Sequence, residues 1–336
     1  MRLMKIAATN FANKIVIKFA ILPAALLLLA VAGQKAQAQA DYPSRTVHVI
    51  VGFVPGSSTD LIARMMAADW SNKLGQQFVV ENRPGAASAI AADQVARAPK
   101  DGYMLLTGGT VNLSTGLVNP KQVFDIERDF TPVILIAGQP MILTVHPSLN
   151  VSSVAELIAL AKSKPGELSY GSTGVGAIPH LLTELFQQKT GTKMVHVPYQ
   201  GSPQATTDLL AGRVQLMFSP AAAVLQHIAA GKLKALAVSS ATRASAAPDL
   251  VTLKEAGVDL DASLWFSIWA PKGTPAAAIE KLSRAGNAAI KGDLAVAMFK
   301  AQGFDAIGGT PEDFAKIQAA ELAKWKLAVD AAGLRK

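Results

Sequence analysis

The feature that most constrains this chain is the regular order in which short apolar strands, glycine-containing turns and helices follow one another. Residues 46–51 are a β-branched, apolar run typical of a buried strand, and the turn GFVPGSST comes next. From Asp60 onward, apolar side chains recur at helical spacing, and the order of strand, turn and helix returns over residues 78–98. Strand–helix–strand units of this length predict an α/β fold built on a parallel sheet.

The first 40 residues have a composition of their own. They hold five Lys or Arg residues and no Asp or Glu, and an apolar stretch over 19–32 leads into AQAQA, which ends at Ala40. A basic start, a short apolar run and an A-x-A end are typical of a cleaved secretory signal peptide. A membrane anchor is the alternative, but the run is shorter than the roughly 20 residues that span a bilayer, and Pro23 interrupts it. We expect a Sec-type signal peptide, cleavage near Ala40/Asp41 and a periplasmic location.

Charge and cysteine content exclude several classes of protein. The formal net charge is +8, but five of the positive charges lie within residues 1–40, so the mature chain carries +3. That small charge predicts no binding to nucleic acid. The chain has no cysteine, which excludes a disulfide scaffold, a thiolate nucleophile, a cysteine-bound metal and a lipid anchor. The absence of thiols also suits an oxidising compartment.

The pattern of the mature chain predicts two α/β domains. An extended apolar run over 132–145 suits a strand that crosses from one domain to the other, and a second run over 264–270 could carry the chain back. The organisation we predict is domain I over 41–139 plus 251–336, domain II over 140–250, and hinge strands near 138–141 and 250–265.

Three turns carry the residues that could bind a ligand: the first loop (52–60), the second loop (171–176) and the third loop (197–203). In open α/β sheets, ligands bind beyond the carboxyl ends of the strands, where helix N-termini present N–H groups that attract anions. Helix capping by Ser58 or Thr59 alone would also explain the first loop. None of the loops contains Lys or Arg, and the second lacks the lysine of a P-loop. We therefore expect an anion held by amides and hydroxyls rather than a nucleotide.

No motif for catalysis or metal binding stands out. The patterns G-x-S-x-G and H-E-x-x-H are absent, and no two histidines are four residues apart. Ser172 and His180 could belong to a hydrolytic triad, and a secreted hydrolase of small esters or amides is the alternative function. His180 could instead contact a ligand or orient the second loop. Trp265 and Trp269 share one face of a strand, which favours core packing over a place in a cleft.

Several segments of the chain resemble one known family. They are YPSRTVHVIVGFVPGSSTDLIAR, VVENRPGAASAIAADQVARAPKDGY, GSTGVGAIPHLLTELF, VPYQGSPQATTDLLAGRVQLMF and AAGKLKALAVSSATR, followed by APKGTP and GGTPEDF. In this order and spacing, the chain resembles the Bug family, the substrate-binding receptors of tripartite tricarboxylate transporters, over essentially all of residues 42–334.

The resemblance implies a type II periplasmic-binding-protein fold, with two α/β domains, a two-strand hinge and a ligand cleft between the domains. It implies a monomeric receptor, not an enzyme, that uses no cofactor or metal and delivers a small organic acid to integral-membrane transporter subunits. The ligand carboxylate would be held by backbone N–H groups, hydroxyls and waters. By position, the implied ligand contacts are Phe53, Pro55, Gly56, Ser57, Ser58, Thr59, Asp60, Gly108, Gly109, Thr110, Ser172, Thr173, Gly174, Gly176, His180, Tyr199, Gly201, Ser202 and Ser219.

The sequence departs from the family pattern at the implied contacts. Ser57 stands where a second glycine is common, Gly52 where proline is common, and Ser219 where aspartate is common. These departures bear on which acid is bound. Because some relatives have no matching transporter, a periplasmic sensor without one is a further alternative.

We expect the mature protein to begin at Asp41, since the A-x-A end of the signal peptide lies directly before it. N-terminal sequencing of the protein recovered from the periplasmic fraction measures this. Recovery of chain that begins at Met1 and is embedded in the membrane would contradict the prediction.

Overall fold

The computed structural model describes residues 42–118, 124–199, 201–331 and 333–334. The following account concerns the compact unit that begins at Arg45. The predicted signal peptide, residues 1–40, lies outside the described residues. In the described ranges, no helix combines the length and the apolar character needed to cross a bilayer.

The N-terminal part of this unit confirms the expected alternation of strand and helix. Strand β1 (Val47–Val51) lies between β2 (Phe78–Asn82) and β3 (Met104–Gly109) and runs parallel to both. Helices α2 (Ser58–Leu74) and α3 (Ala89–Ala96) connect these strands. We call these strands and helices the β1 half.

A second group of parallel strands, which we call the β5 half, is built in the same way. Strand β5 (Ser169–Ser172) runs parallel to β6 (Val195–Pro198) and to β7 (Leu216–Pro220). Helices α7, α8 and α9 each begin shortly after one of these strands, so their N-termini lie at the carboxyl edge of the sheet. The helices of this half are α6 (Val154–Ser163), α7 (Ile178–Thr190), α8 (Ser202–Leu210) and α9 (Ala221–Ala229).

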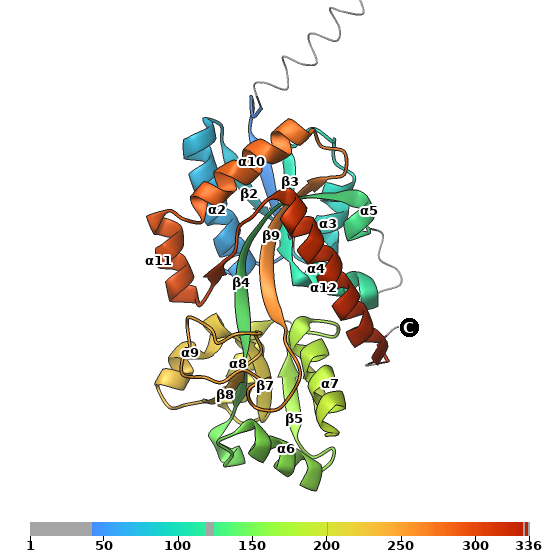
Figure 1. Ribbon diagram of the computed structural model, residues 1–336, viewed down its shortest axis with the longest axis vertical. Coiled ribbons are helices and arrows are strands. Elements are labelled where there is room, and N and C mark those ends of the chain that lie inside the picture. The colour runs from blue at the N-terminus through green and yellow to red at the C-terminus, as the bar shows by residue number, and fades with distance from the viewer. Residues whose placement is uncertain (1–41, 119–123, 200, 332, 335–336) are drawn as a thin grey trace, which may run out of the picture. The chain divides into compact units, whose positions relative to one another are not determined.

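Strand β4 (Phe130–Val145) continues from one half into the other, beside β9 (Ser263–Pro271) (Figure 1). Strand β9 is antiparallel to β3 and to the first part of β4. The last residues of β4 are antiparallel to β7 and to β8 (Lys234–Val238). The predicted parallel pairing therefore holds within each half but not across the whole sheet. The sheet is mixed, with the order β2-β1-β3-β9-β4-β7-β5-β6, because β4 and β9 are not joined to their neighbours by crossover helices.

The partner of β4 changes inside the stretch expected as a hinge. Pro140 is the last residue of β4 that pairs with β9, and Met141 is the first that pairs with β7. Ser239 Oγ accepts the Met141 N–H at 3.1 Å and donates to the carbonyl oxygen of Ala262. The Ser239 side chain thus joins β4 at Met141 to the chain at Ala262, just before β9. The domain boundaries remain a prediction.

Several elements were not expected from the sequence. Helix α4 (Thr110–Val118) has the sequence TVNLSTGLV, whose glycine and threonines favour a loop. Its contacts with α12, β3 and β9 override that local preference. The other unexpected elements are α5 (Ile126–Asp129), β10 (Asp305–Ala306), which pairs with β4, and the short 3-10 helices Ala86–Ser88 and Pro147–Leu149. The C-terminal helices are α10 (Ala276–Ala289), α11 (Asp293–Gln302) and α12 (Pro311–Ala331).

Helix α12 contributes to the apolar cores of both halves. Near its start, the Phe314 ring centroid lies 5.6 Å from that of Trp265 and 5.5 Å from that of Trp269, which confirms that the tryptophans pack in the core. Near its end, Trp325 is fully buried in the cluster that contains Leu181 of α7. One helix therefore joins the two cores through its side chains.

We expect Trp325→Ala to lower the free energy of unfolding by about 3–5 kcal/mol, because it leaves a large cavity where α12 meets the β5 half. Urea denaturation measures the change. The matched control is Leu327→Ala on the same helix, whose side chain is 72% exposed and whose loss should cost less than about 0.5 kcal/mol. Equal effects of the two substitutions would contradict the role given to Trp325.

Candidate functional site

The three loops follow parallel strands and end at helix N-termini. Strand β1 leads into the first loop and α2, β5 into the second loop and α7, and β6 into the third loop and α8. Among the described residues, no hydrogen bond joins the first loop to the second. Helix α4, which follows β3, lies against the second loop, since a Cβ placed on Gly176 would lie 3.2 Å from the Val118 side chain.

Ser57 caps helix α2, and the prediction that Ser58 or Thr59 does so is wrong. Ser57 has an extended backbone, and its Oγ accepts the Asp60 N–H at 3.3 Å, while Ser58 and Thr59 already lie within the helix. The cap leaves the Ser58 and Thr59 N–H groups without an intrahelical acceptor. These two amides give the first loop its capacity to bind an anion.

Asp60 holds the first loop together from inside. Its side chain is buried, and its oxygens accept hydrogen bonds from Gly56 N at 2.8 Å, Arg64 Nε at 2.9 Å and Asn82 Nδ2 at 2.8 Å. Asn82 Nδ2 also donates to the Phe53 carbonyl at 3.0 Å. Burial acts to raise the pKa of Asp60, but the hydrogen bonds and the Arg64 charge outweigh it and hold the pKa below its ordinary value. Asp60 therefore shapes the loop, with its oxygens committed to protein donors.

A strained turn over residues 86–88 lies beside the first loop, and the sequence analysis did not single it out. Ala86, Ala87 and Ser88 have φ angles of 47°, 50° and 75°, a left-handed run that is costly for residues with a Cβ. Ser88 Oγ accepts Asn112 Nδ2 at 3.2 Å, and a Cβ placed on Gly52 would lie 1.9 Å from Ser88 Oγ. This turn joins the candidate site, because it determines how closely the first loop can approach α4.

Packing explains the two glycines that end β3 and the threonine that begins α4. A Cβ on Gly108 would lie 2.2 Å from Asn112 Oδ1, and one on Gly109 would lie 1.9 Å from the Trp265 carbonyl oxygen. Gly109 N donates to Asn112 Oδ1 at 3.0 Å, and Thr110 Oγ1 accepts the Trp265 N–H at 3.0 Å. All three residues are buried, so their conformation supports α4 and β9, and ligand contact by them remains a prediction.

Ser172 closes the second loop on itself. Its side chain is fully buried, and its Oγ lies 3.1 Å from both the amide nitrogen and the carbonyl oxygen of Gly174. Gly174 and Gly176 have φ angles of 133° and 78°, which only glycine adopts readily. Within the described part of the chain, the Thr173 and Val175 N–H groups have no acceptor. These amides are the second loop's free donors.

Two histidines lie against the second loop. Gly176 N donates to His180 Nδ1 at 3.0 Å, and the His180 ring stacks on His196 with centroids 3.9 Å apart. His196 Nε2 lies 2.6 Å from Ser172 Oγ, so the serine's histidine partner is His196 and not His180. Burial lowers the pKa of His180. Burial and the neighbouring His180 lower the pKa of His196 to about 4, so both rings are neutral near pH 7.

Sequence analysis missed His196 because only strand pairing brings it to the loop: β5 and β6 place it opposite Tyr170. The described residues around the second loop form no metal site. Within the described ranges, no group of three His, Asp or Glu side chains could hold a metal ion.

The remaining predicted residues have different surroundings. The Tyr199 hydroxyl donates to Asp208 Oδ2 at 2.9 Å, and burial together with this carboxylate raises the pKa of Tyr199 to about 12. Gly201 has a φ angle of 143° and directly precedes α8, whose first residue is Ser202. Ser219 is fully buried in β7, and its Oγ has no hydrogen-bond partner in the described structure. Ser219 therefore offers an unpaired hydroxyl near the carboxyl end of β7.

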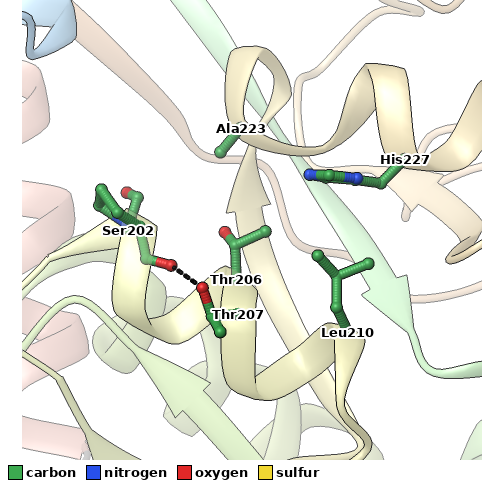
Figure 2. Close-up of a pocket in the computed structure, with 7 residues that line it drawn as sticks. Ser202, Thr206, Thr207, Leu210, Ala223 and His227 are labelled. Carbon is green, nitrogen blue, oxygen red and sulfur yellow. Dashed lines mark hydrogen bonds between the residues drawn. The ribbon is translucent and has the colours of Figure 1, made fainter.

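Figure 2 shows a shallow pocket of about 360 Å³ between α8 and α9. The Thr207 hydroxyl on its wall donates back to the Pro203 carbonyl at 2.9 Å (Figure 2). The pocket contains no residue of the first or second loop, so we do not assign the ligand site to it. Its lining residues are Ser202, Pro203, Thr206, Thr207, Leu210, Ala223 and His227.

We expect Asp60→Asn to lower the free energy of unfolding at pH 7 by about 1–3 kcal/mol, because Gly56 N and Arg64 lose a charged acceptor. The pKa of Asp60 is depressed, so its contribution is present above the ordinary value of 3.8 and is lost as the pH falls through the lower folded value. The wild-type and variant stabilities should therefore converge in acid. Urea denaturation as a function of pH measures this.

The matched control is Asp93→Asn. Asp93 forms the same i,i+4 pair with Arg97 at 2.9 Å, but on the surface. Its loss should cost less than about 1 kcal/mol. If Asp60→Asn were as mild as the control, Asp60 would not organise the loop.

Related proteins share the sequence and fold of this chain. The family model described as tripartite tricarboxylate transporter family receptor matches residues 62–334. BugT of Bordetella pertussis is 39% identical over 303 residues, which cover 89% of this chain and 93% of BugT. The structure of R. palustris Rpa4515 with adipate is 38% identical with a TM-score of 0.80, covering 87% of this chain and 98% of that one. MatC from Rhodopseudomonas palustris with bound malate is 28% identical with a TM-score of 0.76, covering 86% and 100%.

The alignments with BugT and with the two structures are long enough to include both halves and all three loops, whereas the family model begins at residue 62, after the first loop. The α/β fold in which β4 and β9 link two halves is therefore the two-domain periplasmic-binding-protein fold that the sequence predicted. The chain belongs to the Bug family, the receptors of tripartite tricarboxylate transporters.

Proposed function

We propose that this receptor binds a small carboxylate between the first and second loops and delivers it to integral-membrane transporter subunits. It acts in the periplasm as a monomer, after removal of residues 1–40, and performs no catalysis. The observation that carries the proposal is the set of amides that the two loops leave free at the starts of α2 and α7.

The free amides suit an anion for electrostatic reasons. Unpaired N–H groups at a helix N-terminus carry partial positive charge, and the Ser58 and Thr59 amides lie at such a position. Thr173 and Val175 add free N–H groups just before α7. None of the loops contains Lys or Arg, so these amides and the nearby hydroxyls would carry the recognition of the carboxylate.

Dicarboxylates are the first ligands to consider. Two related structures hold adipate and malate, which are both small dicarboxylates. The departures Ser57 and Ser219 alter the polar groups near the loops, since each supplies a hydroxyl where relatives commonly have glycine or aspartate. Neither position adds a negative charge that would oppose a dianion.

One observation bears on the alternative of a secreted hydrolase. The 2.6 Å separation of Ser172 Oγ and His196 Nε2 is that of a nucleophile and its base. Ser172 is fully buried, however, and its hydroxyl is already bonded to Gly174. A pKa of about 4 makes His196 a weak base at neutral pH, and no carboxylate in the described residues bonds to it. The geometry therefore favours a role for this pair in holding the loop.

We expect a dicarboxylate to raise the melting temperature of the mature protein by several degrees. Ligand at about a hundred times its Kd adds roughly 2.7 kcal/mol to stability. A thermal-shift panel of mono-, di- and tricarboxylates, amino acids, sugars and polyamines measures this. A shift with sugars or polyamines alone would overturn the proposal.

Two further measurements separate the alternatives. Turnover of chromogenic esters that is lost in Ser172→Ala would support the hydrolase. Uptake of the stabilising acid by cells that lack this protein should fall and should recover when the protein is restored. Unchanged uptake would favour a sensor without transporter.

A further inference from the structure

The second loop rests on a cluster of three rings, those of His180, His196 and Tyr170. The His196 ring centroid lies 3.9 Å from that of His180 and 4.9 Å from that of Tyr170, with interplanar angles of 5° and 18°. The Tyr170 and His180 centroids are 6.4 Å apart. Two of the rings come from the adjacent strands β5 and β6, and His180 comes from α7. Each histidine contacts the second loop at a different residue. The stacked histidines therefore connect Ser172 at one end of the loop with Gly176 at the other.

The hydrogen bonds fix the protonation of His180. Gly176 N–H donates to Nδ1, so Nδ1 is unprotonated and the neutral ring carries its proton on Nε2. Nε2 lies 4.0 Å from Glu184 Oε1. Glu184 also accepts the Tyr170 hydroxyl and Gln187 Nε2, the latter at 2.9 Å. Glu184 of α7 thus anchors the part of the ring cluster that contains Tyr170 and His180.

The third ring of the cluster, that of His196, is anchored on Ser172. Its Oγ is 2.6 Å from His196 Nε2 and 3.1 Å from the Gly174 amide nitrogen. The hydroxyl therefore links the imidazole to the turn of the loop, between the free amides of Thr173 and Val175. Moving His196 would move or release the hydroxyl that holds this turn.

We propose that His196 is a positioning residue for ligand binding: through Ser172 and through its stack on His180, it sets the backbone of residues 172–176 at which the ligand carboxylate is held. The inference rests on the proposed function of the second loop. Ser172 then acts through the loop backbone, because its buried hydroxyl is already shared with His196 and Gly174. His196 itself needs no contact with the ligand.

Two substitutions separate the hydrogen bond from the packing. His196→Gln keeps an amide group near the position of Nε2, whereas His196→Phe keeps an aromatic ring for stacking but cannot bond to Ser172. We expect the Phe variant to bind the acid about tenfold more weakly or worse, and the Gln variant to retain most of the affinity. Isothermal titration calorimetry with the acid that gives the largest thermal shift measures both.

The matched control is His146→Phe. His146 also pairs with a serine, Ser148, at 2.7 Å, but it lies outside the three loops. Its affinity should equal that of the wild type. Wild-type affinity in His196→Phe would overturn the proposal. The proposal would also be overturned if the Phe and Gln variants lost affinity equally and also lost the same amount of ligand-free melting temperature. That pattern indicates a purely structural residue.

Amide hydrogen exchange of the ligand-free protein tests the positioning without any ligand. The Gly174 and Gly176 amides, which bond to Ser172 and His180, should exchange several-fold faster in His196→Phe than in the wild type. Unchanged exchange would overturn the inference. If the wild type binds no acid but exchange is faster in the Phe variant, the proposed function fails while the positioning of the loop stands.

Discussion

Strand β4 is the element on which both halves depend, because its backbone is bonded to β9 over its first part and to β7 and β8 over its last. Nearly every side chain of this strand is buried, so displacing it would expose backbone and apolar groups in both cores. Pro140 has no N–H to donate, and the partner strand changes directly after it. A side chain, Ser239, accepts the next amide, that of Met141. Hydrogen bonding thus continues through the point where the halves meet.

Helix α12 adds a constraint that two strands alone would not impose. Phe314 belongs to the core of the β1 half, while Trp325 and Val329 belong to the cluster that contains α7. A hinge motion that separated α12 from α7 would expose the fully buried Trp325 indole, at a cost of several kcal/mol. A motion at the predicted hinge would therefore be easiest as a rotation that keeps this contact. The C-terminal turns of α12 would then move with the β5 half.

Local sequence predicted what depends on local chemistry. The strand–turn–helix alternation, the core position of Trp265 and Trp269 and the family could all be read from residue patterns. The antiparallel direction of β4 and β9 could not, because strand direction is decided by long-range pairing. His196 was missed for the same reason, since its approach to Ser172 depends on the pairing of β5 with β6. Helix α4 was missed because tertiary contacts outweigh its weak helix propensity.

The polar groups of the loops fall into those that are bonded within the protein and those that are free. Among the described residues, Asp60, Ser172 and the Tyr199 hydroxyl are bonded internally, and the free groups include the backbone amides of Ser58, Thr59, Thr173 and Val175. An amide cannot turn toward a ligand by rotating about a side-chain bond, so its direction is that of the backbone. Recognition by amides therefore discriminates between ligands by geometry, and it avoids the cost of desolvating a lysine or arginine. It follows that the residues that matter most for specificity can be those that hold the backbone. Asp60 does so in the first loop, and by our inference His196 does so in the second.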